Sequence, residues 1–323
     1  MVALKLFLNA KSSFPYKVSG KLVTGNGSLI PICSLADCSL LPSLTVVEIV
    51  LKFIGRAEGT NIAIKIEFSL TDANGWSVAY HELGHALLQS MYRGETEATC
   101  NFYRAYVLNV KFGEDFDYAF ANSMSHLPYL TPDQAAIHWM VTNNFRDGKD
   151  MDHSNTEHDE FRYQHRGYAK YADIARLYGW DTLINFYRQQ HLNCNNENEC
   201  LGGFQGVDDR TLKLSIAAGN DLTPLIHFWG IQPEDPESLK EGMLELGLGP
   251  STSLKELLMS YKLLIPVTNV EFNDIYETFF PGKPDGSSPL WGAGWFNAWK
   301  DQWNENHGLD SQTAVQNIID LYF

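Results

Sequence analysis

The segment His-Glu-Leu-Gly-His at positions 81–85 restricts the local fold more than any other stretch of this chain. Two histidines four residues apart lie on one face of a helix, and the intervening Glu82 lies beside them. This spacing lets His81 and His85 bind one zinc ion while the carboxylate reaches a water molecule on the metal. The segment therefore predicts a helix that carries a zinc site and hydrolytic chemistry. The alternative is a helix with two surface histidines.

A third zinc ligand has to come from outside this helix, because a catalytic site uses three protein ligands and one open position. Glu95 and Glu97 are the candidates, since both follow the glycine that ends the helix, Gly94. Glu95 lies in the turn itself, whereas Glu97 lies in the first turn of the returning helix. This position favours Glu97 as the ligand, and Glu82 is then the general base that takes a proton from water.

Other residues near the motif, or later in the chain, are further candidates for roles in the site. Asn101 lies one helical turn beyond Glu97 and can orient that carboxylate, or it is an ordinary polar helix residue. Cys100 is expected in the core rather than as a ligand, because a fourth ligand would close the site. His165 and Tyr168 are candidates for stabilising the transition state, although packed or surface roles are more common for such residues.

The composition indicates one large globular protein or two ordinary domains. The chain has 323 residues, of which 44% are hydrophobic, and a formal net charge of -15. This charge repels phosphate backbones, so nucleic acid is not an expected partner. No run of eighteen apolar residues occurs, so we expect no transmembrane segment, and the first residues do not resemble a signal peptide. The sequence does not define an oligomeric state, and we expect a monomer.

The five cysteines suit two small disulfides and one buried thiol. Two close pairs, 33 with 38 and 194 with 200, leave Cys100 alone. The alternative is five reduced thiols. Neither pair has the spacing of a four-sulfur zinc site.

The predicted fold class is α+β, with a zincin-like catalytic domain of the gluzincin type. Residues 1–71 form a β-rich segment, whose clearest strand is 61–70, where Ile62, Ile64 and Ile66 alternate with polar residues. Residues 72–233 form the catalytic core, and residues 234–323 form a helical portion. The active-site helix spans about 79–93, and the returning helix spans 96–110. Further helices are expected at 114–125, 132–145, 157–178, 181–190, 208–218, 288–304 and 311–322, and others begin at Pro224, Pro236 and Ser253.

These motifs resemble those of the enhancin-like, mucin-degrading zinc metallopeptidases. The likeness rests on the motif at 81–85, on Gly75-Trp76 before it, and on Glu97-Ala98-Thr99-Cys100-Asn101 after it. It continues in Leu177-Tyr178-Gly179-Trp180-Asp181 and in the block from 217 to 231, and within the family it is most similar to the bacterial immunomodulating metalloproteases. The region before residue 72 does not resemble the upstream part of that family.

The resemblance implies one Zn²⁺ per chain, bound by His81, His85 and Glu97, with Glu82 as general base. It also implies a glycoprotein or mucin-like substrate, cut near an O-glycosylated residue, and a secreted or cell-surface location. Two other functions stay open at this point. One is a zinc peptidase with no glycan requirement, and the other is a non-catalytic binding or scaffold protein with a fortuitous motif.

Four tryptophans recur every fourth residue from 291 to 303 and form a stripe on a helix. Core packing is the ordinary role of such a stripe. The functional alternative is a platform, centred on Trp295 and Trp299, on which sugar rings of a glycoprotein stack.

Overall fold

The computed structural model contains two compact units, Met1–Trp76 and Ser77–Phe323. The described residues are 18–23, 29–31, 46–53, 62–69, 81, 84, 92, 95–123, 130–151, 159–193, 206–279 and 303–323. For the strands, and for some helical residues that include Glu97 and His165, only the course of the backbone is described.

The first unit contains a four-stranded antiparallel sheet with the order β2-β1-β3-β4. Its strands are β1 (Val18–Val23), β2 (Leu29–Pro31), β3 (Val46–Phe53) and β4 (Ile62–Ser69). The register of β3 and β4 runs from the pair Val46 and Ser69 to the pair Phe53 and Ile62. Each described strand pairs within this sheet.

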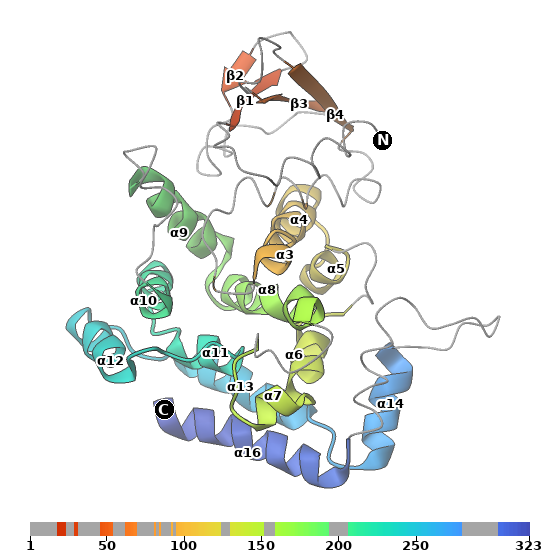
Figure 1. Ribbon diagram of the computed structural model, residues 1–323, viewed down its shortest axis with the longest axis vertical. Coiled ribbons are helices and arrows are strands. Elements are labelled where there is room, and N and C mark those ends of the chain that lie inside the picture. The colour runs from red at the N-terminus through yellow and green to blue at the C-terminus, as the bar shows by residue number, and fades with distance from the viewer. Residues whose placement is uncertain are drawn as a thin grey trace, which may run out of the picture. The chain divides into compact units, whose positions relative to one another are not determined.

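The second unit is helical in all of its described segments (Figure 1). From the start to the middle of the unit the helices are α3 (Thr96–Thr99), α4 (Phe102–Tyr106), the π-helical turn η2 (Val107–Lys111), α5 (Phe116–Ala121), α6 (Pro132–Met140), α7 (Asn143–Arg146), α8 (Asp159–Tyr178) and α9 (Trp180–Asn193). The remaining helices are α10 (Val207–Ala218), α11 (Thr223–Phe228), α12 (Pro236–Glu245), α13 (Thr252–Leu264), α14 (Asn269–Phe279) and α16 (Glu305–Tyr322).

The prediction of one α+β fold is therefore wrong. Residues 77–323 carry the sequence motif, and their described part contains no strand. The described strands all belong to the other unit, where they satisfy one another's backbone hydrogen bonds. Alternation of apolar residues predicts a strand but does not say which element the strand will pack against. A sheet that lines the active-site helix, as a zincin-like fold requires, is not shown.

Local capping explains where several helices begin. Thr131 and Gln134 form a reciprocal capping box at the start of α6, with a proline in its first turn. Asp235 and Ser251 cap α12 and α13 through their side chains. Sequence reasoning placed the second of these caps at Ser253, two residues too late. Thr142 caps α7, and this explains why the helix expected at 132–145 is split into two.

Helix α8 runs through the middle of the second unit and packs against α3, α4, α6 and α9 (Figure 1). The hydrophobic core around it is rich in fully buried aromatic side chains, such as Trp139, Phe228 and Trp229. Trp139 donates a hydrogen bond from Nε1 to the carbonyl oxygen of Phe228 at 2.6 Å. The core therefore joins segments that are far apart in sequence. Because α8 is held firmly in this core, it can position the polar side chains around it.

Candidate functional site

His81 has a helical backbone and a partly exposed side chain. Its Nδ1 lies 2.9 Å from Oδ1 of Asn101, on the turn between α3 and α4. An amide oxygen only accepts hydrogen bonds, so this contact corresponds to the tautomer in which Nδ1 carries the proton and Nε2 the lone pair. Histidines that bind a metal through one ring nitrogen usually donate the other N–H to such an acceptor. From the sequence, Asn101 is either a residue that orients the Glu97 carboxylate or an ordinary polar helix residue. The structure places its amide oxygen on His81, and the Glu97 side chain lies outside the described set.

Gly84, the fourth residue of the motif, contacts the backbone of Cys100 very closely. A Cβ atom built on Gly84 would lie 2.2 Å from the carbonyl oxygen of Cys100 and 2.7 Å from its Cα. Real Cβ atoms do not approach backbone this closely, so only glycine fits at position 84. The glycine therefore allows the motif segment to touch the end of α3, the helix whose backbone carries Glu97.

Cys100 lies at the same contact. Its thiol is buried and is not part of a disulfide, as the sequence predicts. Its Sγ lies 3.3 Å from Nδ1 and 3.7 Å from Nε2 of His81. We use the name His81 corner for the group formed by His81, Gly84, Cys100 and Asn101.

Glu95, the less favoured candidate for the third ligand, is buried, and its carboxylate already has several partners. Its Oε2 accepts hydrogen bonds from the Tyr92 backbone N–H at 3.0 Å, from Thr99 Oγ1 at 3.1 Å and from the Tyr171 hydroxyl at 2.8 Å. Its Oε1 forms an ion pair with Lys170. A carboxylate in this setting has a structural role, because metal binding would require it to give up several of these partners. This observation favours Glu97 over Glu95 as the ligand.

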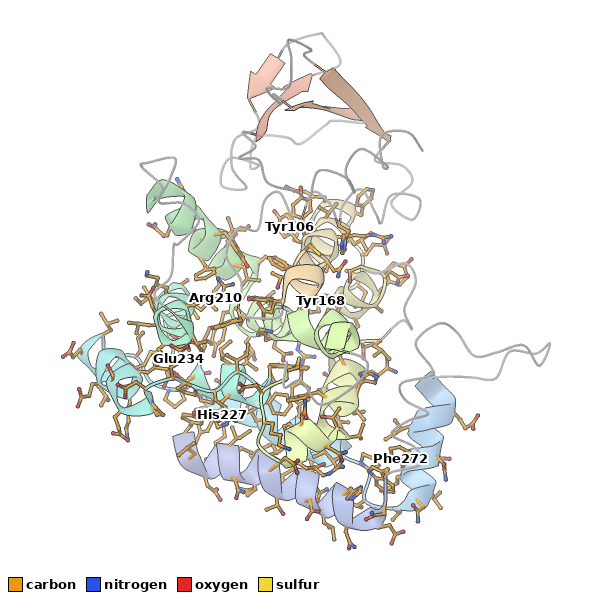
Figure 2. All side chains as sticks on the ribbon, in the orientation of Figure 1. Tyr106, Tyr168, Arg210, His227, Glu234 and Phe272 are labelled. Carbon is orange, nitrogen blue, oxygen red and sulfur yellow. The ribbon has the colours of Figure 1, made fainter. Side chains whose placement is uncertain are left out.

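Glu95 belongs to a buried charge cluster, which we define as Glu95, Lys170, Tyr171, Tyr187 and Arg210. Nη2 of Arg210 donates to the hydroxyl groups of Tyr171 and Tyr187, at 2.8 and 3.3 Å. Burial lowers the pKa of Lys170, while the Glu95 carboxylate acts in the opposite direction. Burial likewise raises the pKa of the Tyr171 hydroxyl well above its usual value, which Arg210 counteracts. Figure 2 shows Arg210 among the helices of the second unit.

The other residues predicted for the site are described only in part. Tyr168 is buried, donates a hydrogen bond to the carbonyl oxygen of Phe120 at 3.2 Å and contacts the hydroxyl of Ser123. Burial raises the pKa of Tyr168, and the nearby Cys100 adds to this shift. His165 lies in α8, with only its backbone described. The residues Glu82, His85, Trp295 and Trp299 lie outside the described residues.

The last residue of the tryptophan stripe has a packing role. Trp303 is buried, and its ring stacks on Phe272 with a centroid separation of 4.4 Å and an interplanar angle of 13°. This contact agrees with core packing at position 303 and carries no information on the sugar platform proposed for Trp295 and Trp299.

The described side chains do not by themselves assemble a metal site. Within that part of the chain, no three His, Cys, Asp or Glu residues come together as a metal-binding group. The side chains of His85 and Glu97, two of the three predicted ligands, lie outside the described set. No described helix is long and apolar enough to cross a membrane.

Comparison with known proteins adds no relative to these observations. No protein-family model, curated protein or solved structure matches the chain.

Two contacts were not predicted from the sequence, the one between Gly84 and Cys100 and the one between Asn101 and His81, and each had one signal in the sequence. These were a glycine inside a helix and an amide one turn after the candidate ligand.

Proposed function

We propose that this protein is a zinc-dependent endopeptidase that cleaves O-glycosylated, mucin-like proteins. The observation that supports it best is the hydrogen bond between Nδ1 of His81 and Oδ1 of Asn101. It holds the imidazole in the tautomer that presents Nε2 as a ligand, and this is how metal-binding histidines are normally oriented. A surface histidine in a fortuitous motif has no need of a buried amide partner, and Asn101 is 4% exposed.

The three predicted ligands suit a zinc ion by the chemistry of their donor atoms. Two imidazoles and one carboxylate, from His81, His85 and Glu97, form a donor set suited to catalytic zinc. Gly84 supports this set, because its contact with Cys100 brings the motif segment against the helix that carries Glu97. When bound, zinc supplies a Lewis acid that activates water and polarises a carbonyl oxygen.

The residues of the chain then have separate roles in the reaction. His81 would hold the zinc ion together with His85 and Glu97, and Asn101 would keep the imidazole ring of His81 in place. Glu82 takes a proton from the attacking water and delivers it to the nitrogen of the leaving amine, so that a carboxylate is regenerated at the end of the cycle. Glu95 takes no part in this chemistry, because its oxygens are held by Lys170, Tyr171 and Thr99.

The glycoprotein substrate and an extracellular location rest on the family resemblance of the motifs and not on the geometry of the site. They are tested by incubating the protein with a mucin-like glycoprotein and with its enzymatically deglycosylated form, with and without chelator. Mass spectrometry of the fragments maps the cut sites. We expect chelator-sensitive cleavage of the glycosylated form alone.

The matched control is Glu82→Gln, which replaces the carboxylate by an amide of the same shape and so removes the proton acceptor. This variant should retain zinc and lose cleavage. Cleavage of both substrate forms would replace the proposal with a zinc peptidase that has no glycan requirement. Full activity of Glu82→Gln would refute the assigned base.

A further inference from the structure

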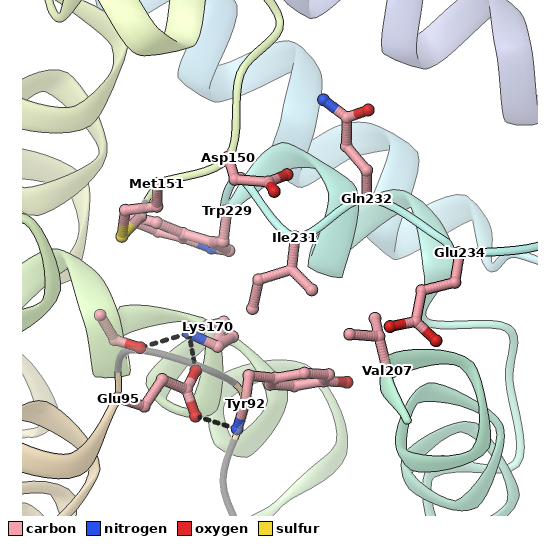
Figure 3. Close-up of a pocket in the computed structure, with 12 residues that line it drawn as sticks. Tyr92, Glu95, Asp150, Met151, Lys170, Val207, Trp229, Ile231, Gln232 and Glu234 are labelled. Carbon is pink, nitrogen blue, oxygen red and sulfur yellow. Dashed lines mark hydrogen bonds and ion pairs between the residues drawn. The ribbon is translucent and has the colours of Figure 1, made fainter. Parts of the chain in front are cut away.

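We draw no further inference here: the strongest candidate, the cavity of about 190 Å³ in the second unit between α8, the start of α10 and the loop after α11 (Figure 3), carries nothing, because its buried ammonium, Lys170, already contacts the Glu95 carboxylate, the Gly167 carbonyl oxygen and the Tyr171 ring, and nothing among the described residues shows which ligand would occupy it.

Discussion

Two polar groups of residues lie close together in the chain and are built in opposite ways. The buried charge cluster around Glu95 is closed, because Glu95, Lys170 and Arg210 are each at most 3% exposed and contact one another through hydroxyl groups and an ion pair. The His81 corner has buried supports, Cys100 and Asn101, under a histidine that is itself partly exposed.

Under the proposed function, the first group stabilises the fold and the second belongs to a metal site. A buried carboxylate whose oxygens already accept several hydrogen bonds gains little from a metal and loses its partners. A histidine that is oriented by a buried amide, and still reaches the surface, is prepared for a ligand at its second nitrogen. Four predictions test this comparison, and they run from the largest expected effect to the smallest.

The largest effect is expected from Glu95→Ala. It leaves the buried ammonium of Lys170 without its counter-ion, and losing one partner of a buried pair costs about 3–5 kcal/mol. Urea denaturation of metal-free protein measures this loss. Glu97→Ala is the matched variant, for which we expect loss of zinc by elemental analysis. If folded Glu95→Ala lost its zinc while Glu97→Ala kept it, the two roles would be reversed.

The second prediction concerns the pH dependence of stability and Asp173, a buried acid of α8 that lies outside the buried charge cluster. Burial raises the pKa of Asp173 to about 6, against the opposing effect of Arg176. The native state therefore holds this proton more tightly than the unfolded state, whose pKa is near 3.8. The contribution to stability is complete below pH 3.8 and is lost as pH rises through 6, by about 3 kcal/mol.

Denaturation of Asp173→Asn across this pH range checks that prediction. The variant cannot titrate at position 173, so its unfolding free energy should fall less between pH 4 and pH 6 than that of the parent protein. Asp209→Asn, on the surface of α10, serves as control. Identical slopes in the parent and in Asp173→Asn would refute the assignment.

The third prediction concerns the contact that shapes the His81 corner. Gly84→Ala inserts a methyl group against the backbone of Cys100, and overpacking of this kind costs about 1–3 kcal/mol. It should also weaken zinc binding, because the motif segment is displaced from α3. Gly242→Ala is the control, since its Cβ would meet only the Leu212 side chain at 3.7 Å. In the interior of a helix, replacing glycine by alanine raises the free energy of unfolding by about 0.5–1 kcal/mol. If Gly84→Ala had the same free energy of unfolding and the same zinc affinity as the parent protein, the close contact between Gly84 and Cys100 would be contradicted.

The smallest effect is expected from Asn101→Ala. Loss of the partner that orients a metal-binding histidine typically lowers metal affinity by about 10–100-fold. Competition with a chromophoric chelator measures this affinity, and Asn101→Asp should restore it because a carboxylate also accepts the Nδ1 proton. Unchanged affinity in Asn101→Ala would mean that the hydrogen bond to His81 does not serve a metal.

Several helices of the second unit were predictable from the sequence. Expected ranges such as 157–178 and 208–218 agree closely with α8 and α10. The exceptions have local causes. Thr142 caps a new helix and splits the one expected at 132–145, and the helix expected at 96–110 is interrupted at Cys100 and Asn101 and ends in the π-helical turn η2.

The buried charges were not predictable from the sequence. Lys170 and Arg210 lie in helices whose pattern gives them no distinctive position. Their partners, Glu95 for Lys170 and Tyr171 for Arg210, are distant in the chain. Periodicity indicates which face of a helix is apolar, but it does not show which charged residue finds a buried partner. The α+β prediction failed for a related reason, because strand alternation does not identify the element on which a sheet packs. The motif at 81–85 carried more information, since its spacing has a direct chemical meaning.

The central claim is that the His81 corner belongs to a zinc site. The most direct measurement is the zinc content of the purified protein and of His81→Ala after equilibration with zinc and removal of excess metal. We predict about one zinc per chain in the parent protein and none in the variant. A parent protein without zinc, or a folded variant that keeps it, would contradict the account.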